Sequence, residues 1–137
     1  MNREIKFRVW WAKYNVWATE QSFTRCLIDQ YGQLVKWDPR FIPEVQDQND
    51  FIISQYTGLK DKNGKEIWEG DKVCIDDVPY QNLSIIGIVT YVEDVSGFRV
   101  VDQSGERYPL WIGEGIFEVI GNIYENSELL GGINEGN

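Results

Sequence analysis

The chain has 137 residues, of which 42% are hydrophobic and 26% are charged, and its formal net charge is −9. This length and composition predict one soluble globular domain, or two small subdomains that share an interface, and exclude fibrous and disordered chains. The sequence contains no His, which excludes Ser-His-Asp and Cys-His catalytic sites and His-based zinc sites.

The charge is unevenly distributed along the chain. Residues 1–72 contain 11 Lys and Arg and 11 Asp and Glu, whereas residues 73–137 contain 2 and 11. An acidic surface repels phosphate backbones, so the C-terminal half is a poor candidate for nucleic-acid binding. No run approaches the roughly 18 apolar residues of a membrane helix, and the N-terminus lacks the apolar core of a signal peptide. We therefore expect a cytoplasmic protein in which Cys26 and Cys74 are buried, reduced thiols.

The first predicted element is a strand at residues 4–11, where apolar and polar residues alternate. Its apolar face would hold Ile5, Phe7, Val9 and Trp11. Trp10 falls on the polar face beside Arg8, so both a partner-facing and a buried position are open for it. Further strands are predicted at residues 16–19, 23–28 and 34–37, of which 23–28 could alternatively form a helical turn. Residues 38–50 hold two Pro and several acidic or amide residues, which predicts an exposed loop.

Residues 55–71 carry the densest set of residues that shape the backbone. Asn63-Gly64 lies between 55–59 and 65–68, and this pair tolerates two consecutive positive φ angles, so it predicts a tight hairpin. Gly58 predicts a bulge. Glu69-Gly70-Asp71 predicts a second turn before the next strand.

The remaining strands are short and evenly spaced, at residues 72–75, 85–92, 98–101, 106–112 and 116–124. Five such strands with bending glycines, among them Gly87, predict a small SH3-like barrel. Asn126 could cap a helical turn at 127–130. The predicted fold is therefore mainly β with minor α: an N-terminal antiparallel β-subdomain (1–57), a hairpin plus SH3-like β-barrel (58–130) and a flexible tail (131–137), in one compact unit.

Three segments resemble the YopX-like proteins of bacteriophages and prophages. They are Arg3 to Trp10, Gln55 to Val73 and Val119 to Asn126, and they occur in the family's order. The chain departs from the family's pattern at Trp11-Ala12-Lys13, where relatives often have an Asp, and at Ser127, where Pro is frequent. The resemblance implies a phage or prophage origin, a bacterial host cell and the β fold. It implies no chemistry.

Aromatic residues make up 14% of the chain, and their rings can stack on bases or form the centre of a protein interface. We expect most of them, including Trp68 and Phe117, to be core residues. The candidate partner-binding residues are Arg3, Lys6, Arg8, Trp10, Tyr14 and Tyr56. The aromatic rings among them would stack on bases or pack against a protein, and the basic groups would contact phosphates or a protein.

The sequence predicts no catalytic residue, no cofactor and no metal site. Asp61-Lys62-Asn63-Gly64 lacks the distal Glu of a calcium loop, and a hairpin turn accounts for it. The paired carboxylates Asp76-Asp77 and Glu93-Asp94 are typical of solvated turns, with a metal-binding or acid–base role as the alternative.

These observations favour a phage or prophage accessory protein that is not an enzyme and acts as a protein-binding or self-assembling module, with a homo-oligomer expected. The neutral half and the acidic half of the chain suit head-to-tail contact. The alternative is a small-barrel protein that binds single-stranded nucleic acid through its N-terminal half. A more remote alternative is a carboxylate-dependent hydrolase.

Overall fold

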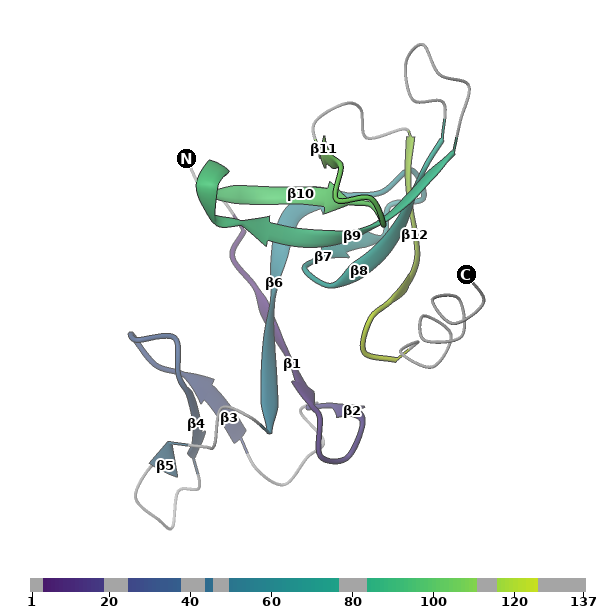
Figure 1. Ribbon diagram of the computed structural model, residues 1–137. Coiled ribbons are helices and arrows are strands. Elements are labelled where there is room, and N and C mark those ends of the chain that lie inside the picture. The colour runs from purple at the N-terminus through teal and green to yellow at the C-terminus, as the bar shows by residue number, and fades with distance from the viewer. Residues whose placement is uncertain are drawn as a thin grey trace. The chain divides into compact units, whose positions relative to one another are not determined.

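The computed structural model describes residues 4–18, 25–37, 44–45, 50–76, 84–110 and 116–125 (Figure 1). The tail predicted at 131–137 and the helical turn predicted at 127–130 lie outside these residues. The chain divides into two compact units, which we call the N-terminal unit (Phe7–Ser54) and the barrel unit (Met1–Lys6 with Gln55–Asn137). Strand β6 (Phe51–Lys60) contributes its first four residues to the former and its last six to the latter.

The prediction of a mainly β fold is confirmed, since the only helix among the described residues is the short 3₁₀ segment η1 (Glu93–Val95). In the N-terminal unit, β1 (Phe7–Trp11) pairs antiparallel with β2 (Val16–Trp17). A second sheet joins three strands in the order β3-β4-β5: β3 (Arg25–Ile28), β4 (Leu34–Trp37) and β5 (Glu44–Val45). β5 lies inside the region predicted to be a loop, so that prediction is wrong there, because Val45 and Glu44 continue the ladder of β4.

The alternation predicted for the first strand does not match the burial of its side chains. Val9 and Trp10 are both buried, whereas Phe7 is exposed. Trp10 lies opposite Trp17 in the β1–β2 ladder, and the two rings meet edge to face with their centroids 5.0 Å apart. The β1–β2 hairpin therefore buries the Trp10 indole, because a second Trp on the neighbouring strand packs against it.

The barrel unit contains a curled antiparallel sheet of five strands (Figure 1). They are β8 (Asp71–Ile75), β9 (Ile85–Val92), β10 (Gly97–Val101), β11 (Arg107–Pro109) and β12 (Phe117–Asn122). Their order is β11-β10-β9-β8-β12, so four strands form a meander and the last strand returns to pair with the first. This connectivity is that of the predicted SH3-like barrel.

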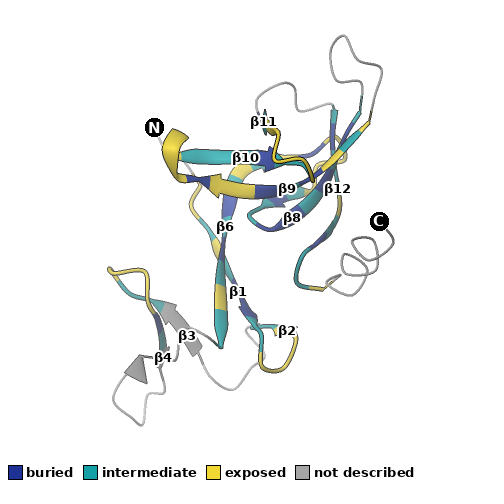
Figure 2. Ribbon diagram, in the orientation of Figure 1, coloured by how far each residue is buried: buried dark blue, intermediate teal, exposed yellow. Residues whose placement is uncertain are grey.

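The inner face of this sheet forms the hydrophobic core of the barrel unit. Its buried residues are Ile67, Val73, Ile75, Val89, Val100, Leu110 and Phe117, and Figure 2 shows the buried positions along β8, β9 and β10. The core role predicted for Phe117 is confirmed. Gly87 is needed for close packing between strands, since a Cβ at this position would lie 2.6 Å from Val100 Cγ1 and 2.7 Å from the Val101 carbonyl oxygen.

The predicted hairpin forms between β6 and β7 (Glu66–Trp68), and the register shift between Tyr56 and Lys60 confirms the bulge predicted at Gly58. The prediction of two positive φ angles in its turn is wrong, because only Gly64 has one, at +81°. The Asp61 carboxylate stabilises the turn without a second positive φ angle. Its Oδ1 accepts the N–H groups of Asn63 and Lys65, at 2.9 and 2.8 Å. The side chain thereby closes the turn as an Asx-type cap.

The same turn occurs at three places in the described part of the chain. In each, Asp Oδ1 accepts the N–H groups two and four residues later, and a glycine with positive φ follows at the third position. The three turns begin at Asp29, Asp61 and Asp102. The recurring pattern Asp-x-x-Gly followed by a polar residue is thus a local hairpin signal, and at Asp61 it outweighs the preference of Asn-Gly for the two-residue turn.

Candidate functional site

The basic residues proposed from the sequence do not form a row of free cations. Arg3 lies outside the described residues. Lys6, in the barrel unit, forms ion pairs with Glu4, at 3.1 Å, and with Glu66. Arg8, in the N-terminal unit, donates from Nε to Ser54 Oγ at 3.1 Å, and its guanidinium lies 4.3 Å from the centroid of the Trp17 ring. Both described cations are engaged within their own unit.

The proposed aromatic residues occupy different environments. Trp10 and Tyr56 are buried, at 5% and 4% exposure, whereas Tyr14 is exposed and meets Trp11 edge to face at 4.5 Å. Lys6 and Tyr56 are brought together, with Lys6 Nζ 4.8 Å from the Tyr56 ring centroid. Of the two alternatives left open for Trp10, the structure shows burial.

One carboxylate of each predicted pair contacts a basic side chain. Asp76 accepts hydrogen bonds from Ser84 Oγ at 3.0 Å and Lys62 Nζ at 3.3 Å, which hold the pKa of this carboxyl below its ordinary value. Asp94 accepts two hydrogen bonds from Arg107, both 2.9 Å long, with the same effect on its pKa. Asp77 lies outside the described residues. In the part of the chain that is described, no three Cys, Asp or Glu side chains gather closely enough to hold a metal ion.

A cluster of rings and charges surrounds Lys6 in the barrel unit. Tyr56 and Trp68 lie with their centroids 5.4 Å apart, and the Lys6 ammonium lies 5.9 Å from the Trp68 ring. Burial raises the pKa of the Tyr56 hydroxyl, and the negative charges of Glu66 and Glu4 raise it further, whereas Lys6 lowers it. The cluster therefore holds two carboxylates against one ammonium group.

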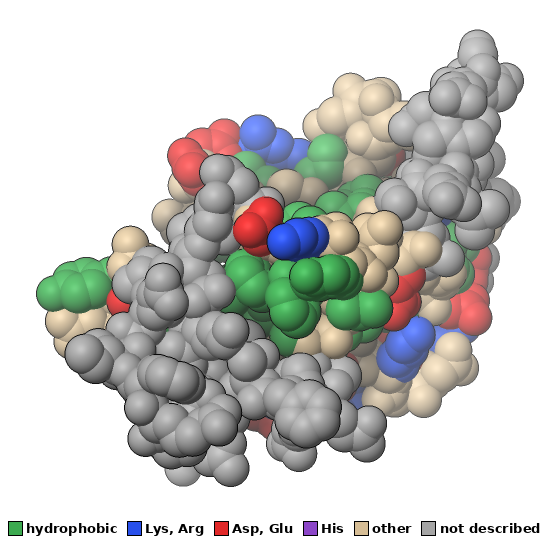
Figure 3. Space-filling model, turned by 90° about the horizontal axis from the view of Figure 1, so that it is seen from below, with side chains coloured by type: hydrophobic (Ala, Val, Ile, Leu, Met, Phe, Trp, Pro, Cys, Tyr) green, Lys and Arg blue, Asp and Glu red, His purple; other side chains and the backbone are tan. Residues whose placement is uncertain are grey.

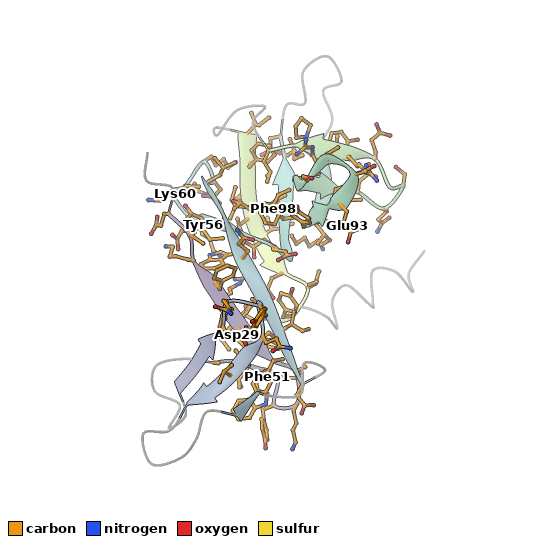
Figure 4. All side chains as sticks on the ribbon, turned by 90° about the vertical axis from the view of Figure 1, so that its left-hand side faces the viewer. Asp29, Phe51, Tyr56, Lys60, Glu93 and Phe98 are labelled. Atoms are coloured by element: carbon orange, nitrogen blue, oxygen red, sulfur yellow. The ribbon has the colours of Figure 1, made fainter. Side chains whose placement is uncertain are left out.

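A cavity of about 350 Å³ lies next to this cluster, between β6 and the β9–β10 hairpin. We call it the aromatic pocket. The rings of Tyr56, Tyr91 and Phe98 line it together with the Glu4 carboxylate, and Figure 4 shows Tyr56 and Phe98 on these two elements. Tyr91 and Phe98 meet edge to face at 5.5 Å, and Tyr91 is 46% exposed. The pocket therefore offers the half-exposed Tyr91 ring, the partly buried Phe98 ring and one negative charge, whereas the Tyr56 ring is buried.

A larger cavity, of about 740 Å³, lies on the outer face of the barrel sheet. We call it the apolar groove. Its floor follows the ladder, in which Ile88 pairs with Val101 on one side and with Lys72 on the other. Ile86 lies two residues before Ile88 on the same face and is 49% exposed. The Lys72 ammonium group has no hydrogen bond or ion pair to a described residue. The groove therefore combines aliphatic side chains, of which Ile86 is exposed, with the Lys72 ammonium group and the Asp102 carboxylate.

Of the residues that line these two cavities, only Tyr56 was among the binding residues predicted from the sequence, although a signal for the apolar groove exists. The run Ile85-Ile86-Gly87-Ile88-Val89 is apolar on both faces of its strand, which is typical of a sheet covered on both sides. No comparable signal marks the aromatic pocket, because Glu4, Tyr56 and Tyr91 come from distant parts of the chain.

Charged side chains of both signs lie beside hydrophobic ones on the face that Figure 3 shows. Within the described residues, no helix is long and apolar enough to span a membrane.

The fold defines a mainly β protein with a curled, barrel-like sheet, and its candidate sites are the two cavities lined by described residues of the barrel unit. The family model described as YopX protein matches residues 6–131, and the chain therefore belongs to the YopX family, as its three motif segments predict.

Two solved structures are similar to this one. The crystal structure of protein EF1440 from Enterococcus faecalis has a TM-score of 0.57 at 27% identity, covering 94% of this chain and 99% of that one. The crystal structure of protein yopX from Bacillus subtilis also has a TM-score of 0.57, at 21% identity, covering 90% and 95%. A comparison with curated proteins found no match.

Proposed function

We propose that the protein is a non-catalytic protein-binding module of phage or prophage origin that acts in the cytoplasm of a bacterial host. The observation that supports this most is the apolar groove on the outer face of the barrel sheet. Ile86 lies half exposed on that face, Ile88 follows it on the same strand, and Val101 lies opposite Ile88 on the neighbouring strand β10. Aliphatic groups exposed together in a groove are typical of a surface that a protein partner covers.

Charge favours a different protein over a second copy as the partner. The barrel unit contains 8 Lys and Arg and 16 Asp and Glu, a net charge of −8, whereas the N-terminal unit has a net charge of −1. Contact between two barrel units would bring like charges together, and a partner with basic groups would not. The same charge argues against nucleic acid as the ligand of this unit, and Lys6 is already paired with two carboxylates.

The proposal is tested with the full-length protein, carrying an affinity tag, in bacterial host cells. Ile86→Asp places a charge in the apolar groove, and Thr90→Asp places the same charge on an exposed position of the same strand and face, outside the groove. Captured proteins are compared by mass spectrometry with and without nuclease.

We expect the wild-type protein and Thr90→Asp to retain one protein in near-stoichiometric amount, independent of nuclease, and Ile86→Asp to lose it. Light scattering of the purified chain in low salt reports self-association in parallel. Equal capture by the two variants, or capture that disappears with nuclease, would refute the assignment of the groove. Dimers that Ile86→Asp abolishes would make a second copy the partner.

A further inference from the structure

The aromatic pocket has the composition of a site for an organic cation. Three rings line it, from Tyr56, Tyr91 and Phe98, and Glu4 is the only charged side chain among its lining residues. Ring faces attract cations through their quadrupole, and a carboxylate at the rim adds a charged partner. The nearby Lys6 ammonium is already paired with Glu4 and Glu66, so the described residues offer an anionic ligand no free partner there.

In the cluster next to the pocket, one of these rings, that of Tyr56, already holds an ammonium group. Lys6 Nζ lies 4.8 Å from the centroid of the Tyr56 ring. Lys6 neutralises only one of the two carboxylates that it contacts, and the Glu4 side chain remains 61% exposed. One negative charge at the edge of the pocket is therefore in excess and open to solvent. Tyr91, on the opposite wall, keeps nearly half of its surface exposed.

We infer that the aromatic pocket receives an arginine side chain of the protein partner, with the guanidinium stacked on the rings of Tyr91 and Phe98 and paired with the Glu4 carboxylate. The inference rests on the proposed protein-binding function and adds the chemistry of the partner. Arginine is favoured over lysine, because a planar guanidinium can stack on a ring and bond a carboxylate through two N–H groups together. The net charge of −8 on the barrel unit attracts such a partner over a distance.

The test uses short peptides of the form acetyl-Gly-Xaa-Gly-amide, in which Xaa is Arg, Lys or norleucine. Each is titrated into the full-length protein while the aromatic resonances of Tyr and Phe are followed by NMR, and spermidine serves as a small free cation. We expect the Arg peptide to shift the Tyr91 and Phe98 resonances in a saturable way, the Lys peptide to bind more weakly, and the norleucine peptide to have no effect.

Four variants separate this site from unspecific attraction. Tyr91→Leu keeps an apolar side chain but loses the ring, and weakens binding of the Arg peptide about 2- to 5-fold. Tyr91→Phe retains the ring and the affinity. Glu4→Gln weakens binding by a similar factor, about 2- to 5-fold, and reduces its dependence on salt. Tyr31→Leu removes a 78% exposed tyrosine of the N-terminal unit and leaves binding unchanged.

Equal shifts with the norleucine peptide would overturn the inference. So would the absence of a saturable shift with the Arg peptide at concentrations up to about 10 mM, since weaker binding would not define a site. Spermidine binding as well as the Arg peptide, with the same dependence on Tyr91, would overturn the assignment to a protein side chain in favour of a free polyamine. Failure here leaves capture through the apolar groove intact, because Ile86 does not line the aromatic pocket. If neither the capture assay nor the peptide titration gave the expected result, the proposed protein-binding function would be refuted.

Discussion

Replacing Asp61 by Asn tests a buried polar side chain that joins two parts of the barrel unit. Asp61 is buried, and its carboxylate accepts three backbone N–H groups. Oδ1 accepts those of Asn63 and Lys65 within the hairpin turn, and Oδ2 accepts that of Val119 on β12 at 2.9 Å. The side chain therefore joins the β6–β7 hairpin to the last strand of the barrel.

The structure sets the size of the expected effect. Asn keeps one oxygen for the turn but turns an amide N–H toward the N–H of Val119, so one hydrogen bond to a charged group is lost and a buried donor loses its acceptor. Hydrogen bonds to charged groups contribute about 1.5–3 kcal/mol, and a buried unsatisfied group costs about 1–3 kcal/mol. Since these two figures describe the same broken contact, we expect Asp61→Asn to lower the free energy of unfolding by about 2–3 kcal/mol.

Urea unfolding followed by circular dichroism measures this loss, and hydrogen exchange of the Val119 N–H reports the broken contact directly. Asp102→Asn is the matched control, because Asp102 caps an identical turn but its Oδ2 accepts only the Tyr108 hydroxyl, at 3.3 Å. We expect a clearly smaller loss for Asp102→Asn. Equal losses for the two variants would refute the role of the contact with Val119.

The pH dependence follows from the same carboxylate. Burial alone would raise the pKa of Asp61, but the N–H groups of Val119, Lys65 and Asn63 outweigh it, and the pKa lies below its ordinary value. The stabilisation is therefore complete above the unfolded-state pKa of about 3.9 and is lost as the pH falls through the lower folded-state pKa. The difference in stability between wild type and Asp61→Asn should shrink in acid, and a difference that stays constant down to about pH 2 would contradict this.

Three further predictions concern single residues. Gly87→Ala places a Cβ 2.6 Å from Val100 Cγ1 and should lower the free energy of unfolding in urea by about 1–3 kcal/mol. Gly97→Ala should have a smaller effect, because its nearest neighbour is the movable Arg99 Nη1 at 3.3 Å. Equal effects would contradict the role of close packing at Gly87. Lys6→Met removes the positive charge that lowers the pKa of Tyr56, so the Tyr56 hydroxyl should titrate at higher pH, as followed by ultraviolet absorbance. An unchanged titration would show that Lys6 does not lie over the Tyr56 ring. Burial and the neighbouring Asp76 raise the pKa of the Cys74 thiol. In a Cys26→Ser background, alkylation of Cys74 near neutral pH should therefore be slower than that of a peptide cysteine, and Asp76→Asn should make it faster. An unchanged rate after Asp76→Asn would refute the contact between Cys74 and Asp76.

Local backbone chemistry made much of the barrel unit predictable from the sequence. Gly58 marks a bulge, and residues 85–92 form β9 with the predicted bounds. These features depend on residues close together in the chain, so turn residues and alternation reveal them.

Features that depend on distant residues were not predictable in this way. Trp10 is buried because Trp17 on the next strand covers it, although the alternation around Trp10 indicates a polar face. The turn at Asp61 differs from the Asn-Gly prediction because the Asp61 side chain satisfies backbone groups of its own turn and of Val119. The aromatic pocket joins Glu4, Tyr56 and Tyr91, whose proximity only the fold creates.

A photo-activatable amino acid placed at position 86 of the full-length chain in host cells tests the proposed protein-binding surface most directly, with position 63 in the exposed hairpin turn as the control. We expect a covalent adduct to one protein at position 86 that is absent at position 63 and survives nuclease. Adducts of the same proteins at both positions, or an adduct to nucleic acid at position 86, would contradict the assignment of the apolar groove as a protein-binding surface.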